Sequence, residues 1–91
     1  MTTKQIKAIV SGKVQRVWFR ANTQKKALEL GLTGQAINLA NGNVEVIACG
    51  EQAGVEQLIA WLHIGSEKAV VDKVEVEELE SAETFTDFTT G

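Results

Sequence analysis

The segment Val10–Arg20 changes within a few residues from the periodicity of a strand to that of a helix. Apolar residues alternate over residues 6–14, which is the period of a half-buried strand. From Phe19 on, the residues Phe19, Thr23, Ala27 and Leu30 recur at helical spacing. A strand that turns directly into a helix leaves backbone N–H groups without intrahelical partners at the positive end of the helix dipole. The junction is therefore a candidate anion site, to which Arg20 adds a cation.

Basic residues are concentrated around this junction. Residues 1–28 contain seven Lys and Arg and no Asp or Glu, whereas the remainder contains all 12 acidic residues and only Lys68 and Lys73. The net charge of −3 argues against general binding to nucleic acid. A local positive field in an otherwise acidic chain suits a small anion better than a long polyanion.

Beyond the junction, the pattern predicts a hairpin, a second helix and a further strand. Thr33–Leu39 and Val44–Cys49 are prone to form strands, and the Asn-Gly pair between them is a strong hairpin signal. Ala53–Ile64 has the apolar spacing of an amphipathic helix. Lys73–Leu79 alternates as a half-buried strand, and the tail Glu80–Gly91 is a candidate for a short fifth strand.

The order strand, helix, strand, strand, helix, strand predicts an α+β sandwich of the ferredoxin-like type, an antiparallel sheet with two helices on one face. A length of 91 residues fits one domain over residues 1–91. No apolar run approaches the roughly 20 residues of a membrane helix, and nothing argues for secretion, so we expect a cytoplasmic protein without membrane partners. The lone Cys49 excludes an intrachain disulfide and a cysteine zinc cluster. We expect a monomer because no heptad is present.

Two blocks of this sequence resemble the two signatures of the acylphosphatase family. Gly12-Lys13-Val14-Gln15, followed by Val17-Trp18-Phe19-Arg20, looks like the first, in which strand 1 passes into helix 1. Gly31-Leu32-Thr33-Gly34, then Asn38, then Gly42-Asn43-Val44-Glu45 looks like the second, on the hairpin. The resemblance covers residues 5–80 and implies hydrolysis of acyl phosphates without a metal or organic cofactor.

The resemblance also implies roles for particular residues. The family's catalytic arginine falls on Arg20 and its catalytic asparagine on Asn38. Its phosphate-binding loop falls on Val14, Gln15, Arg16, Val17, Trp18 and Phe19. Arg20 would grip the phosphoryl group bidentately, the loop backbone would hold its other oxygens, and Asn38 would orient the attacking water. Inorganic phosphate or sulfate should then bind weakly to the same site.

The physical chemistry agrees with these roles. The leaving carboxylate of an acyl phosphate has a conjugate acid with a pKa of about 4, so it departs without a general acid. The chain offers a loop and an arginine, Arg20, that can stabilise charge on the phosphoryl oxygens, and a residue, Asn38, that can position water. The single histidine, His63, lies in the predicted second helix, away from the loop.

Several interpretations remain open at this point. Arg16 stands where the family usually has glycine, so it either adds a positive contact or crowds the cradle. If it impairs turnover, the chain is instead a non-catalytic phosphate- or acyl-phosphate-binding module, like the domain that begins hydrogenase-maturation carbamoyltransferases. Gln35 replaces a common aromatic residue. Gln15 either contacts the ligand or pins the loop backbone. Trp18 either stacks on a substrate acyl group or is a half-exposed packing residue.

Overall fold

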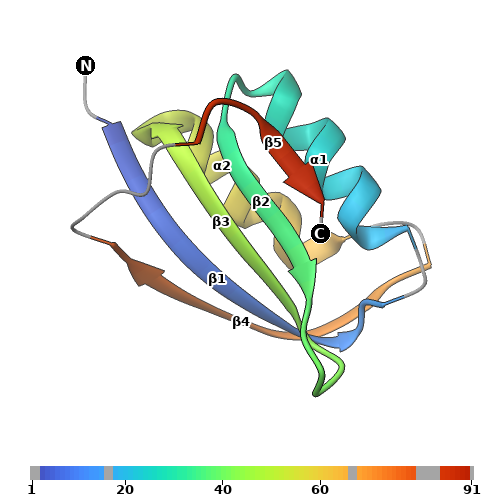
Figure 1. Cartoon of the computed structure of the whole chain (residues 1–91). Coiled ribbons are helices and arrows are strands. Elements are labelled where there is room, and N and C mark those ends of the chain that lie inside the picture. The colour runs from blue at the N-terminus through green and yellow to red at the C-terminus, as the bar shows by residue number, and fades with distance from the viewer. Residues whose placement is uncertain (1–2, 16–17, 66–67, 80–84, 91) are drawn as a thin grey trace.

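The computed structural model describes residues 3–15, 18–65, 68–79 and 85–90 (Figure 1). In chain order the elements are β1 (Thr3–Lys13), α1 (Phe19–Glu29), β2 (Thr33–Asn38), β3 (Val44–Glu51), α2 (Gln52–Ile64), β4 (Val70–Glu78) and β5 (Phe88–Thr90). None of the helices in these ranges is long and apolar enough to cross a membrane.

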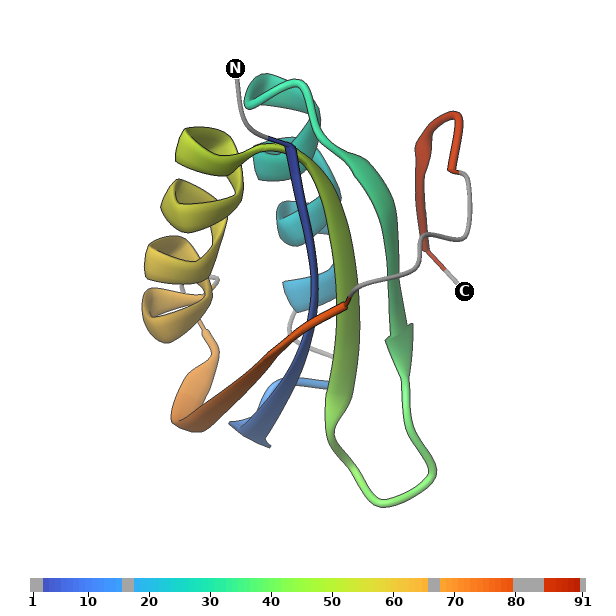
Figure 2. The same ribbon diagram turned by 90° about the vertical axis from the view of Figure 1, so that its left-hand side faces the viewer.

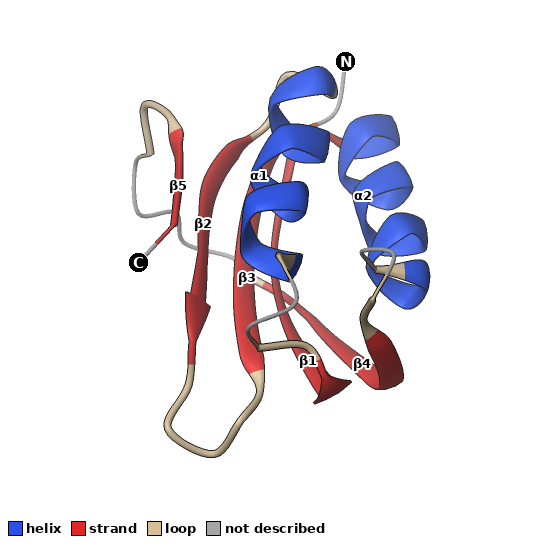
Figure 3. Cartoon of the chain, turned by 90° about the vertical axis from the view of Figure 1, so that its right-hand side faces the viewer, coloured by secondary structure: helices blue, strands red, loops and turns tan. Residues whose placement is uncertain are grey.

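The strands form one sheet in the order β4-β1-β3-β2-β5. The first four are antiparallel to their neighbours, whereas β5 runs parallel to β2. Both helices cover the same face of this sheet, as Figures 2 and 3 show. The predicted ferredoxin-like sandwich and the short fifth strand are confirmed, and β5 makes the sheet mixed rather than wholly antiparallel.

Alternate side chains of the central strands form the core beneath the two helices. Ile6, Ala8 and Val10 of β1 are fully buried, and so are Leu58 and Leu62 of α2. The strand period of two therefore places one apolar face under the helices, as the sequence pattern predicts.

Strand β4 is more exposed than its alternation predicts. It begins at Val70, three residues earlier than expected, and the Val76 side chain is 44% exposed. Among the described strands, β4 lies at the edge of the sheet and pairs with β1. An apolar residue at a sheet edge has a neighbouring strand on one side only, so alternation alone overestimates its burial.

The end of β1 departs from regular pairing with β4. The register against β4 shifts between Ser11 and Gly12. Gly12 has a φ of 124°, and a Cβ there would overlap the carbonyl oxygen of Val70. Only glycine fits this close approach, and such an irregularity re-aims the end of a strand.

Candidate active site

The N-terminus of α1 has no side-chain cap. Its N-cap residue, Trp18, has the left-handed dihedral angles φ 64° and ψ 16°, and no acidic residue lies in the first turn. The backbone N–H and the side-chain amide of Asn22 donate to the Trp18 carbonyl oxygen at 3.0 and 2.8 Å. The first N–H groups of a helix have no intrahelical acceptor, so this end favours an anion.

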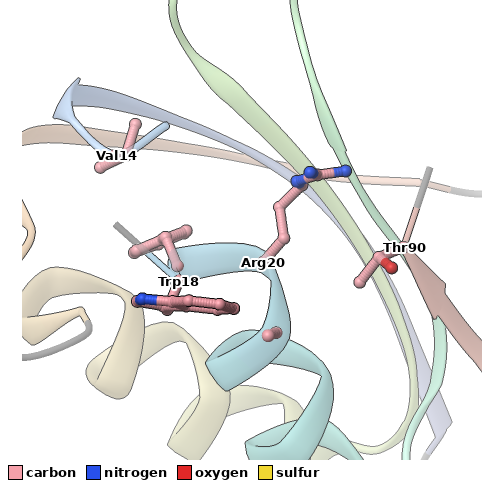
Figure 4. A pocket seen from close by; sticks show the side chains of 6 residues that line it. Val14, Trp18, Arg20 and Thr90 are labelled. Carbon is pink, nitrogen blue, oxygen red and sulfur yellow. The ribbon is translucent and has the colours of Figure 1, made fainter. Parts of the chain in front are cut away.

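A pocket of about 300 Å³ opens at this end of α1 (Figure 4). It is lined by Val14, Trp18, Phe19, Arg20, Ala21 and Thr90. In Figure 4 the Arg20 guanidinium extends away from α1, with Val14 on one side of it and Thr90 on the other. Among these lining residues Arg20 carries the one formal charge. A pocket that combines a guanidinium with a helix N-terminus suits a small anion.

The start of α1 is fixed by the far end of α2. Phe19 is 1% exposed, and its ring centroid lies 5.7 Å from that of Trp61. Gly65, the C-cap of α2, lies against the same ring: a Cβ there would be 3.0 Å from Phe19 Cε1. Val14 is also 1% exposed, so both side chains belong to the core. This anchoring sets the position of Arg20, the next residue.

Gln15 ties the loop after β1 to the β2–β3 hairpin. Its Nε2 donates to the carbonyl oxygens of Leu39 at 2.8 Å and Asn43 at 2.9 Å. The N–H of Leu39 in turn donates to the Asn43 carbonyl oxygen at 2.8 Å, which closes the hairpin loop. The Gln15 side chain therefore pins the loop, and its contact with a ligand stays a prediction.

Asn38 is the last residue of β2 and is exposed. Alternation places it on the helix-covered face of the sheet with Ala36, which is fully buried. Ala36 pairs with the pocket residue Thr90, and Asn38 lies roughly 7 Å further along β2. Asn38 does not line the pocket itself. It precedes Leu39, however, and the Gln15 side chain joins Leu39 to the loop.

The structure brings most of the predicted loop residues to this one place. Val14, Trp18, Phe19 and Arg20 line the pocket, and Gln15 fastens the loop beside it. Arg16 and Val17 lie outside the described residues, so what the sequence suggests for them stays a prediction.

Two features of the pocket differ from the sequence-based picture. Trp18 is 74% exposed, so its interpretation as a half-exposed packing residue is wrong. Thr90 was not predicted to line the pocket. It lies on a three-residue strand whose place beside β2 no local pattern indicates. Within the described ranges, no group of three or more His, Cys, Asp or Glu side chains is placed to hold a metal ion.

Comparison with known proteins decides the family. The model of the acylphosphatase family matches residues 6–90. The chain belongs to the acylphosphatase family. Acylphosphatase of Marinobacter nauticus is 50% identical over 90 residues, which cover 99% of this chain and 98% of the relative. The family match includes β5, so Thr90 is part of the family domain although the resemblance seen in the sequence ended before it.

Solved acylphosphatase structures share the fold. The structure of an acylphosphatase from Coxiella burnetii superposes with a TM-score of 0.93 at 44% identity and covers 98% of this chain and 93% of its own. The acylphosphatase from Bacillus subtilis gives a TM-score of 0.93 at 31% identity, with 97% and 98% covered. The predicted family and fold are therefore confirmed.

Proposed function

We propose that this chain hydrolyses the carboxyl-phosphate bond of small acyl phosphates to a carboxylate and inorganic phosphate. The observation that carries the proposal is the pocket at the uncapped start of α1, with Arg20 as its charged lining residue. Its volume of about 300 Å³ lies at the lower end of the range for small-molecule sites. Relatives that carry the name acylphosphatase over their whole length support the same activity.

Arg20 binds the phosphoryl group in this proposal. A guanidinium presents two parallel N–H donors that match two phosphoryl oxygens. Backbone N–H groups of Gln15 to Phe19 hold the other phosphoryl oxygens. Phosphoryl transfer concentrates charge on these equatorial oxygens, so donors fixed there before reaction stabilise the transition state. The anchored Phe19 ring and the Gln15 side chain keep the donors in place.

Asn38 orients the attacking water through its side-chain amide. The water oxygen forms a bond to phosphorus while the bond from phosphorus to the acyl oxygen breaks, and its electron pair leaves with the carboxylate. A proton of the water passes to a phosphoryl oxygen of the substrate. The conjugate acid of the leaving group has a pKa of about 4, so no general acid is required. The Gln15 bond to Leu39 supports this role, because it ties the residue after Asn38 to the Arg20 loop.

The non-catalytic binding module is not favoured. The acylphosphatase of Marinobacter nauticus matches this chain over 98% of its own length, so the similarity is to a free-standing protein of the same size. The proposal requires no metal or organic cofactor, and it includes a monomer in the cytoplasm acting on a small molecule, as the sequence suggests.

The test is hydrolysis of benzoyl phosphate in water enriched in oxygen-18. Attack at phosphorus places the heavy oxygen in inorganic phosphate, and attack at the carbonyl carbon places it in benzoate. We expect labelled phosphate, unlabelled benzoate, and weak competitive inhibition by added phosphate or sulfate. A folded protein that does not accelerate the reaction, or one that labels benzoate, would contradict the proposal.

A further inference from the structure

We propose that Trp18 selects the acyl group of the substrate: its indole stacks on a planar apolar acyl group while Arg20 holds the phosphoryl end. This inference rests on the proposed function and adds the class of acyl group that the site prefers.

The first support is the exposure of the indole at the pocket. Trp18 is 74% exposed, although it lines the pocket. The second aromatic lining residue, Phe19, is 1% exposed and packs against Trp61. Among the described lining residues, Trp18 therefore offers the aromatic surface that a bound molecule can touch. Stacking on it would remove apolar surface of both partners from water.

The second support is that packing does not explain this side chain. A left-handed backbone is uncommon for a bulky residue and costs free energy. Trp18 adopts it with φ 64°, and its exposed indole gains little burial in return. Two hydrogen bonds from Asn22 fix the Trp18 carbonyl oxygen. The backbone from which the indole extends at the pocket is thus held by hydrogen bonds before any ligand arrives.

The third support is the arrangement of polar and apolar side chains around Arg20. In Figure 4, Trp18 and Val14 lie on one side of the Arg20 side chain, and Thr90 with its hydroxyl lies on the other. A substrate whose phosphoryl group meets the guanidinium can extend its acyl group over the apolar side. An aromatic acyl group there would meet the indole, whereas an acetyl group is too small to cover it.

The experiment compares kcat/KM for benzoyl phosphate and acetyl phosphate. Specific aromatic contacts correspond to a ratio change of about threefold to tenfold. We expect Trp18→Ala and Trp18→Leu to lower the benzoyl-to-acetyl ratio by that factor, and Trp18→Phe to keep most of it. Leu28→Ala is the control, since Leu28 is 50% exposed and lies about 15 Å further along the axis of α1. It should leave the ratio unchanged.

The benzoyl-to-acetyl ratio of kcat/KM distinguishes a role of Trp18 in acyl-group selectivity from a purely structural role. A structural defect at the helix start lowers both values of kcat/KM together and leaves their ratio intact. An unchanged ratio in folded Trp18→Leu would overturn the inference. Calorimetry with benzylphosphonate and methylphosphonate provides a second measurement without turnover. The wild type should bind benzylphosphonate more tightly than methylphosphonate, and Trp18→Leu should remove this preference. The same preference for benzylphosphonate in the wild type and in Trp18→Leu would also overturn the inference. Absence of wild-type turnover of either acyl phosphate would instead refute the proposed function.

Discussion

The Gln15 side chain links the loop after β1 to the β2–β3 hairpin. Gln15→Leu keeps a similar volume and removes the Nε2 donor, so the carbonyl oxygens of Leu39 and Asn43 lose bonds of 2.8 and 2.9 Å. The substitution therefore tests one linkage without opening a large cavity.

The expected loss of stability follows from these two bonds. A side-chain hydrogen bond contributes about 0.5–1.5 kcal/mol net, so two contribute about 1–3 kcal/mol. Both bonds are only partly buried, and water can replace part of what is lost. We therefore expect the free energy of unfolding to fall by about 1–2 kcal/mol. In a domain of this size that corresponds to a fall in Tm of about 4–16 °C.

Gln15→Leu should also lower the activity of the folded protein, and not only the fraction that is folded. Arg20 lies on one side of the linkage and Asn38 on the other, and a misplacement of about 1 Å between reacting groups can cost about 100-fold in rate. We expect kcat/KM for benzoyl phosphate to fall at least about tenfold at a temperature where the variant is folded.

Urea unfolding followed by circular dichroism measures the stability change. Gln52→Leu is the matched control, because Gln52 Nε2 donates to Glu56 Oε2 at 3.0 Å on the exposed surface of α2, away from the loop. It should stay within about 0.5 kcal/mol of the wild type. If Gln15→Leu also stays within that margin and keeps full activity, the two bonds do not hold the site together.

Three further substitutions test the sheet. Gly34 has a φ of 142°, and a Cβ there would overlap the Ile47 carbonyl oxygen, so Gly34→Ala should cost at least about 3 kcal/mol in urea unfolding. Gly42→Ala, at φ 93° with nothing within 4 Å of the added Cβ, should cost only about 1–2 kcal/mol, and equal losses would show that the close approach to β3 is not the cause. Phe88 is fully buried, so Phe88→Ala should lower the free energy of unfolding by about 3–5 kcal/mol. A loss below about 1 kcal/mol would mean that β5 is not part of the core.

The elements that local patterns determine were predictable from the sequence. Alternation predicted β1, helical spacing predicted α1 and α2, and the Asn-Gly pair predicted the hairpin between β2 and β3. Each of these features depends on residues close together in the chain, which is where periodicity and turn chemistry act. The two family signatures then indicated the loop and the strand end that the structure joins through Gln15.

The parallel pairing of β5 was not predictable in this way. Three residues carry too little periodicity, and contacts distant in sequence hold the strand. Gln24 Nε2 donates to the Phe88 carbonyl oxygen at 2.8 Å, and the N–H of Gly34 donates to the Asp87 carbonyl oxygen at 2.9 Å. The place of Thr90 in the pocket follows from this pairing.

The exposure of Trp18 was also beyond the sequence. Composition favours burial of a tryptophan on average. In the structure the Trp18 backbone is left-handed and its indole is exposed to solvent instead. A left-handed conformation at a single residue has no periodic signal in the sequence.

The assignment of the two site residues is tested by the kinetics of Arg20→Ala and Asn38→Ala with benzoyl phosphate, with circular dichroism to confirm folding. Removing one preorganised donor to a transition state costs about 100- to 1000-fold in rate, and we expect losses of that order in both variants. Phosphate inhibition should disappear in Arg20→Ala and persist in Asn38→Ala, since one residue binds the phosphoryl group and the other positions water. Turnover at the wild-type rate by either folded variant would contradict the assignment.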